Sequence, residues 1–365
     1  MSGKWDPCVS HQGPAVTTFI SEYFADPSRF VMLIAGAGFD PRAPVISTLI
    51  AQAAGSRTRG IFIREERPTP NPALVLRAEQ NLQRMAATLP NCEIVNIQIF
   101  AQDGAVIGGR GVAQFINGVD LTRITDIIVD CSALSIGISF PMVRQLLSRA
   151  ETRLNVHLMV TNAPTIDAAI IATASDTGGP VHGFMGELGL SSSEGKAKLW
   201  LPQLTKDQKA MLARIYAFRT PDDVCPILPF PSLTPRLADE LIEHYSQEFQ
   251  SSWQVDAGDI VYADEDNPLD LYRTILRMDD TRKRVFAGIG GSIMMISPIG
   301  SKALAIGALM AAMERDFPVI YVEAISYVAH LDSLDRKIDH TKSLVHVWLC
   351  GDIYPRWDTL TEMTS

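Results

Sequence analysis

The chain has 365 residues, of which 47% are hydrophobic and 20% charged, as is typical of folded globular proteins. This length exceeds that of one ordinary domain, so two domains are expected. The 32 basic and 41 acidic residues give a net charge of −9, which argues against a broad nucleic-acid-binding surface because such surfaces need clustered lysines and arginines.

The cysteines and histidines are spaced too widely for a metal centre or a disulfide framework. The five cysteines contain no Cys-x-x-Cys pair, and none of the seven histidines approaches another ligand at metal-binding spacing. We therefore predict reduced thiols, no metal and no cofactor. The N-terminus lacks a signal-peptide pattern, and every apolar run is shorter than the roughly 20 residues of a membrane span. These features predict a soluble, cytoplasmic protein without a membrane partner.

Strand and helix patterns alternate in the first half of the chain. Short runs rich in valine and isoleucine predict buried parallel strands at 29–35, 59–63, 93–100, 126–131 and 155–161. Helical patterns lie between them, at 43–54, 72–88, 112–117 and 141–150. Alternation of this kind predicts an α/β fold in which helices cover both faces of a parallel sheet.

A second α/β pattern follows a loop-rich stretch at 175–195. It predicts helices at 206–218, 235–250, 269–284 and 303–313. It predicts strands at 224–230, 259–263 and 319–322, a strand that begins at 292, and a further edge strand at 344–349. We therefore expect two Rossmann-like units with parallel sheets flanked by helices. The predicted boundaries are a leader (1–28), the two units (29–195 and 196–350) and a tail (351–365).

The first predicted strand runs into the glycine-containing loop Ala-Gly-Ala-Gly-Phe-Asp-Pro-Arg at 35–42. Gly36 and Gly38 suggest a dinucleotide-binding turn, but Pro41 stands at the third glycine position and no acidic residue follows at the required distance. Asp40 is expected to cap the next helix, which disfavours a phosphate there. It would suit ribose hydroxyls, with Arg42 contacting a phosphate from the side. A purely structural turn is the alternative.

Carboxylates follow two other predicted strands. Asp130 ends the strand at 126–131 and is expected to reach the same crevice as the glycine loop. Asp264 and Glu265 end the strand at 259–263, where paired carboxylates can bind a metal or act as acid and base. Ion pairing with Arg273 or Lys302 is the simpler interpretation of these two.

Two segments place a cation at a predicted helix start. Gly300, Ser301 and Lys302 follow a buried strand and precede a helix of small residues, so backbone N–H groups and the Lys302 ammonium would face an anion. Arg236 follows a proline-rich run, and a cation there opposes the helix dipole unless it binds a carboxylate or phosphate. The alternative is that Ser301 only caps its helix and Lys302 is solvated.

The segment Ser-Pro-Ile-Gly-Ser-Lys at 297–302, with Gly307 in the helix and the strand from Val319, resembles the CRISPR-associated Rossmann-fold (CARF) sensor family. Pro298-Ile299 stand where that family has Thr-Gly. The resemblance implies a pocket for a nucleotide second messenger, such as a cyclic oligonucleotide, at a homodimer face. Carried over to this chain, the loop 300–302 would contact that ligand. No recognisable nuclease or DNA-binding domain follows.

Three functional hypotheses follow from these patterns. The first is a sensor or accessory protein of a prokaryotic antiviral defence system, acting as a homodimer with a possible partner protein from the same operon. It would bind a nucleotide-like or phosphorylated ligand, with phosphates at Lys302, Arg236 and Arg273 and ribose at Asp40 or Asp264. The second is a hydrolase or transferase acting on a nucleotide or phosphosugar, with a strand-end carboxylate as base. The third is a scaffold for oligomer contacts.

Overall fold

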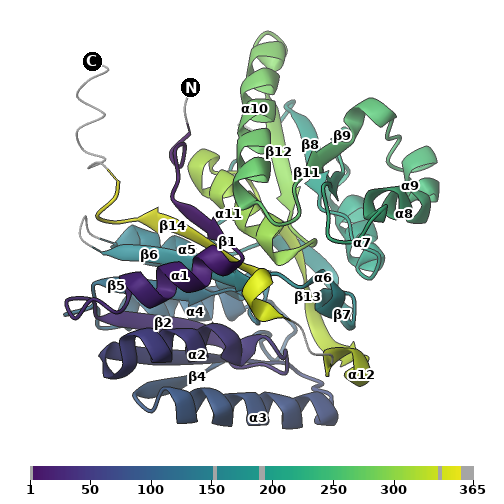
Figure 1. Ribbon diagram of the computed structural model, residues 1–365. Helices are drawn as coiled ribbons and strands as arrows, with labels where there is room; N and C mark the ends of the chain where they lie inside the picture. Colours follow the sequence, from purple (N-terminus) through teal and green to yellow (C-terminus); the bar gives the residue numbers. More distant parts are fainter. Residues whose placement is uncertain (1–2, 151–153, 189–193, 336–338, 355–365) are drawn as a thin grey trace.

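The computed structural model describes residues 3–150, 154–188, 194–335 and 339–354 and contains one larger and several smaller β-sheets (Figure 1). The larger sheet has seven strands in the order β1-β14-β6-β5-β2-β3-β4. Five neighbouring parallel strands match those predicted in the first half of the chain: β2 (Val31–Gly36), β3 (Thr58–Glu66), β4 (Cys92–Gln98), β5 (Asp126–Asp130) and β6 (Asn155–Thr161). The predicted α/β class, with a mostly parallel sheet, is confirmed.

Helices cover both faces of this sheet (Figure 1). One face carries α1 (Pro14–Tyr23), α2 (Ala43–Ala54) and α3 (Pro72–Thr88), and the other carries α4 (Gly108–Gly118) and α5 (Ile136–Arg149). Successive side chains of β2 alternate between the two cores, because neighbouring residues of a strand point to opposite faces: Leu33 packs with α1–α3 and Ile34 with α4 and α5.

The two ends of the described chain complete the larger sheet. β14 (Leu344–Cys350) pairs antiparallel with β6, and β1 (Ser10–Gln12) pairs antiparallel with β14. The strand expected at the edge of the second unit therefore lies in the larger sheet. The predicted leader contributes β1 to this sheet and α1 to one of its faces. Positions 355–365 of the predicted tail lie outside the described residues.

The smaller sheets are connected to one another by isolated parallel bridges. β8 (Ala197–Pro202) pairs in parallel with β12 (Ser292–Ser297) and β9 (Asp223–Val224), while β10 (Ile227–Pro229) pairs with β11 (Val261–Ala263). Bridges at 203/227 and 296/319 link β8 to β10 and β12 to the start of β13 (Ile320–Ala329). The resulting order, β11-β10-β8-β12-β13, has the same pattern as β4-β3-β2-β5-β6. Its central strand, β8, was not predicted.

Helices also pack on both sides of β8. Trp200 of β8 faces α7 (Lys209–Arg219), α8 (Leu237–His244) and α9 (Ser246–Gln250), and Leu201 faces α10 (Pro268–Phe286) and α11 (Lys302–Arg315). Short helices α6 (Pro164–Asp167) and α12 (Leu331–Leu334) flank an antiparallel pair made by β13 and β7 (Ile170–Pro180). β7 occupies part of the predicted linker, whose positions 189–193 lie outside the described residues. The boundary at 195/196 stays a prediction.

Helix α11 is buried over most of its length, from Ala303 to Ala312. Helix α10 packs against it so closely that a side chain at Gly307 would collide with the backbone of Pro268. The apolar cluster around α11 also includes residues of β2 and α5. A helix that is apolar all round belongs in a core. The small residues of α11 are thus explained by neighbours in the same chain and give no support to a homodimer.

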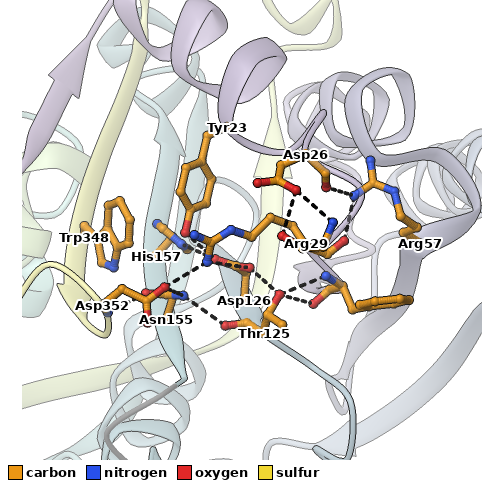
Figure 2. Close-up of polar contacts among 12 residues, drawn as sticks. Tyr23, Asp26, Arg29, Arg57, Thr125, Asp126, Asn155, His157, Trp348 and Asp352 are labelled. Atoms are coloured by element: carbon orange, nitrogen blue, oxygen red, sulfur yellow. Dashed lines mark hydrogen bonds and ion pairs between the residues drawn. The ribbon is translucent and has the colours of Figure 1, made fainter.

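A chain of buried polar groups crosses the strands beneath α1. His11 on β1 contacts His346 on β14 (2.9 Å), whose other ring nitrogen contacts His157 on β6 (3.0 Å). His157 in turn contacts Asp126 at the start of β5 (3.2 Å). Figure 2 shows Asp126 surrounded by hydrogen-bonding and ionic partners, including the Tyr23 hydroxyl (2.9 Å). This network lies near the amino ends of β5 and β6. It joins the terminal strands β1 and β14 to the parallel strands, because each of the four strands contributes one of its residues.

We expect this histidine chain to make stability depend on pH. Burial lowers the pKa of His157 and of His11 below 6.5 and that of His346 well below it. Below about pH 6.5 the unfolded chain therefore binds more protons than the folded one, and the free energy of unfolding falls as pH drops. Each histidine that stays neutral contributes up to about 1.4 kcal/mol per pH unit.

Urea unfolding at pH 7.5 and pH 5.5 measures this effect, with an expected loss of roughly 1–3 kcal/mol at the lower pH. The double variant His157→Gln, His346→Gln should show a smaller loss, whatever its absolute stability. If the double variant lost as much stability between these pH values as wild type, the buried histidines would not be the cause of the pH dependence.

Candidate functional site

A cavity of about 590 Å³ lies where the carboxyl ends of both sets of parallel strands meet. The strand order reverses between β2 and β5 in the larger sheet and between β8 and β12 in the smaller set. Such a reversal leaves a crevice at the strand ends, where α/β proteins bind ligands. Both crevices contribute to the wall of this cavity, the first through Gly38 and Ser132 and the second through Gln203 and 298–302. Its volume is in the range of roughly 300–1,000 Å³ found for small-molecule sites.

The two glycines of the loop after β2 have different surroundings. A Cβ at Gly36 would lie 2.7 Å from the carbonyl oxygen of Ala133, so the loop after β5 can approach only because this residue is glycine. Gly38 lines the cavity, and its carbonyl accepts a hydrogen bond from Asn81 (2.9 Å). Of the two predicted contacts, only Gly38 is on the wall.

Asp40 and Arg42 form a buried ion-pair cluster. The prediction that Asp40 caps the helix is wrong, because the capping position is Arg42. The phosphate contact of Arg42 stays a prediction. Helix α2 begins one residue after Arg42, whose own backbone N–H is accepted by Asp40 (2.9 Å). The Arg42 guanidinium, 1% exposed, pairs with Asp40 (2.6 Å) and Asp167 (2.7 Å). Burial lowers the pKa of Arg42, but the two carboxylates outweigh burial and raise it. Both residues line the cavity, yet the cation is already compensated.

Asp130 is buried and is not among the residues that line the cavity, in contrast to its predicted approach to the crevice. One of its oxygens accepts the backbone N–H of Ser132 (2.9 Å), and the other has no hydrogen-bond partner among the described residues. Burial raises the pKa of Asp130 to about 7. Ser132 does reach the wall, where its hydroxyl accepts the N–H of Thr161 (2.8 Å).

The predicted loop 300–302 lines the second crevice as a unit. Ser301 caps α11 by accepting the N–H of Leu304 (3.2 Å), as expected for serine at a helix start. Lys302 extends across the cavity and donates to the carbonyl of Leu134, in the loop after β5 (2.7 Å). The charged end of Lys302 therefore lies between the two crevices. It makes no ion pair with any described residue.

Three other predicted ligand contacts lie outside the cavity lining, because acidic or backbone partners hold them elsewhere. Arg236 is largely exposed and pairs with Asp239 in the first turn of its own helix (3.3 Å). Arg273, on α10, pairs with Asp6 near the N-terminus (2.9 Å). Asp264 accepts a backbone N–H within its own turn (3.1 Å). The predicted Asp264–Arg273 and Asp264–Lys302 pairs do not form.

Glu265, next in sequence to Asp264, does line the cavity and is only 2% exposed. Its carboxylate accepts the N–H of Leu233 (3.1 Å) and pairs with no described cation. Burial raises the pKa of Glu265. Its backbone carbonyl accepts from Asn162 (3.2 Å) and Ser301 (3.3 Å), which fixes the turn against the start of α11.

Sequence reasoning missed the opposite wall, built around Arg67. The Arg67 side chain is 6% exposed and pairs with Glu65 (2.6 Å) and Glu323 (3.4 Å). It also lies over the ring of Tyr327, 5.0 Å from the ring centre. Burial raises the pKa of Glu323 to about 7, despite the nearby guanidinium. The sequence did contain a signal for this wall, because Glu65 comes shortly after the strand predicted at 59–63 and so near the carboxyl end of the sheet.

Gln203, also missed, follows the unpredicted strand β8. It is 1% exposed and lines the cavity beside Gly300, where a Cβ would come within 3.1 Å of its side-chain oxygen. Its amide nitrogen donates to the carbonyl of Leu304 (3.2 Å), but its oxygen has no partner among the described residues. Such an unpaired buried acceptor is uncommon in folded proteins.

Neither a metal centre nor a membrane span is found in the described part of the chain. No three or more histidine, cysteine or acidic side chains there are grouped so that they could hold a metal ion. Among the same residues, every helix is too short or too polar to cross a bilayer.

No protein-family model matches the chain, and no curated protein sequence matches it. The resemblance to CARF sensors therefore stays a prediction.

Three solved structures among those that match show a distant likeness to this chain. The glycopeptide N-methyltransferase MtfA, complexed with sinefungin, has 10% identity and a TM-score of 0.23, over 46% of this chain and 62% of that one. Precorrin-6y C5,15-methyltransferase from Geobacter metallireducens has 15% identity and a TM-score of 0.24, over 46% and 76%. A trans-2-enoyl-CoA reductase from Clostridium acetobutulicum, in complex with NADH, has 9% identity and a TM-score of 0.22, over 78% of this chain and 63% of that one. TM-scores this low carry no argument about function.

We expect Arg42→Met to destabilise the fold strongly, because it leaves Asp40 and Asp167 buried without their cation. Breaking a buried ion pair on one side costs about 3–5 kcal/mol. The matched control is Arg64→Met, which removes an arginine that also has two carboxylate partners but is 32% exposed. It should cost less than about 1 kcal/mol. Urea unfolding compares them, and equal losses would show that burial of the Arg42 cluster is unimportant.

Proposed function

We propose that this protein binds a nucleotide-like or phosphorylated small molecule in the cavity between the two sets of strand ends. The observation that carries this proposal is the meeting of two strand-order reversals on one small-molecule-sized cavity, with the start of α11 and the Lys302 ammonium on its wall. Helix starts and lysines are the groups that proteins use to hold phosphates. Arg236 and Arg273 lie elsewhere, so Lys302 alone would bind the anionic group.

The biological role proposed for this binding is that of a sensor or accessory protein. The CARF resemblance of the loop 300–302 suggests a nucleotide second messenger, a prokaryotic antiviral defence system and a partner protein from the same operon. It also suggests a homodimer, although the small residues of α11 are occupied within the chain. Light scattering on the purified protein tests this, since a monomer with and without nucleotide would contradict the shared pocket.

A second candidate is an enzyme that uses a carboxylate base, because Glu265 combines a position on the wall with a pKa raised by burial. Raising the pKa of a carboxylate brings it closer to the operating pH, which favours proton transfer by general acid–base catalysis. Incubation with nucleotides and phosphosugars, followed by chromatography, tests this alternative. Turnover that Glu265→Gln abolishes would favour it over pure binding.

We expect Lys302→Met to weaken binding of a nucleoside monophosphate by about 10- to 100-fold, the scale of a charge-assisted hydrogen bond. Calorimetric titration of wild type and variant with adenosine, guanosine, cytidine and uridine 5′-monophosphates measures the change.

The control is Lys283→Met, which removes an exposed lysine on α10 that pairs with Asp279 outside the cavity. Its affinities should equal those of wild type. A Lys302→Met protein that folds and binds as tightly as the control would overturn the proposed role of Lys302.

A further inference from the structure

The cavity wall carries more acidic than basic side chains, although a phosphorylated ligand would call for the reverse. Its acidic residues are Asp40, Glu65, Glu66, Asp167, Asp207, Glu240 and Glu265, and its basic residues are Arg42, Arg64, Arg67, Lys206 and Lys302. The wall is therefore formally two charges negative.

Four of the five cations are already paired. Arg42 and Arg67 each bind two carboxylates, Arg64 lies near two others, and Lys206 pairs with Glu240 (2.5 Å). Only Lys302 has no carboxylate partner among the described residues. On the acidic side, Asp207 and Glu265 likewise have no cation within ion-pair distance. The uncompensated part of the wall is thus one cation and two carboxylates.

The helix starts of the first crevice are covered by the protein's own carboxylates. At the start of α5, Glu65 accepts the N–H of Ser135 (2.8 Å), and Glu323 lies so close to Gly137 that a side chain there would collide with its carboxylate. At the start of α2, Asp40 accepts a hydrogen bond from the backbone N–H of Arg42, the capping residue. A phosphate cannot occupy either position without displacing a carboxylate, so this side of the cavity repels anions.

The second crevice differs because the start of α11 has no carboxylate on it. Its capping group is the neutral Ser301 hydroxyl, and the neighbouring charge is the Lys302 ammonium. Beside it, the buried Gln203 oxygen is an acceptor without a donor. Asp167, another residue of the wall, also has one buried oxygen without a hydrogen-bond partner among the described residues. The Ser135 hydroxyl is the third wall group in the described residues with a buried atom that has no hydrogen-bond partner. The Gln203 and Asp167 oxygens can only accept hydrogen bonds, so hydroxyl or amine donors would satisfy them.

We infer that the ligand carries a single anionic group, held at Lys302 beside the start of α11, and a remainder rich in hydroxyl or amine donors that faces Gln203 and the acidic wall. This inference rests on the proposed function and narrows its ligand class. A nucleoside monophosphate fits the description. A triphosphate or a cyclic oligonucleotide does not, because each further phosphate would face carboxylates with no cation left to compensate it.

Calorimetric titration in EDTA-containing buffer tests this with a matched series. The probes are the four common ribonucleosides, their 5′-monophosphates, their 5′-triphosphates and cyclic tetra-adenylate. For at least one base, the monophosphate should bind about ten-fold or more tightly than both the nucleoside and the triphosphate, and more tightly than the cyclic tetranucleotide. Lys302→Met should reduce the affinity for the monophosphate to that for the nucleoside. Lys302→Arg should still bind the monophosphate more tightly than the nucleoside and the triphosphate.

Glu265→Gln supplies an independent arm, because it removes one uncompensated charge from the wall while keeping the shape of the side chain. We expect it to bring triphosphate binding several-fold closer to that of the monophosphate, whereas Lys283→Met leaves the ratio unchanged. Tightest binding by a triphosphate or by cyclic tetra-adenylate would overturn the single-anion inference and leave the proposed nucleotide binding intact. Binding by no member of the series would overturn both.

Discussion

The burial of helix α11 is the constraint on which the rest of the structure depends. Its small residues allow α10 to pack at backbone distance, and its other sides join the core shared with the larger sheet. An interior of this kind is closely packed and deforms little. The start of the helix is therefore held at a defined position, directly opposite the loop after β5.

This position explains why two crevices form a single cavity. Lys302 reaches from α11 to the loop after β5, and Asn162, after β6, binds the turn that contains Glu265. Both contacts run from the larger sheet to elements that follow the smaller strands. They hold strand ends from distant parts of the chain together, so the site needs no rearrangement to exist.

The charge distribution of the site follows from how its arginines are used. Arg42 and Arg67 are buried, and a buried guanidinium needs carboxylates around it. Each gathers acidic side chains onto the wall of the first crevice, which thereby becomes a rigid, acidic surface. In the loop 300–302 of the second crevice the one charged side chain is Lys302. It binds the carbonyl of Leu134, and no described carboxylate pairs with it.

The sequence by itself determined the α/β class, five strands of the larger sheet, most helices and the position of the loop 300–302 between a buried strand and a helix. These depend on local patterns: valine- and isoleucine-rich runs, helix periodicity and serine capping. It missed β8, which follows the glycine- and serine-rich stretch. It also missed the pairing of β1 and β14, because strand pairing joins segments that are far apart in sequence.

Only the tertiary structure decided which charged residues face the cavity. Arg42, Arg236 and Arg273 were equivalent as sequence candidates, yet one is buried in an ion-pair cluster and two pair with carboxylates elsewhere. Gln203 reaches the wall although the sequence did not single it out, and of the paired carboxylates Asp264 and Glu265 only Glu265 lies there. Whether a cation is free for a ligand depends on which carboxylates lie within a few ångströms, and those partners come from segments that only the packed fold brings together.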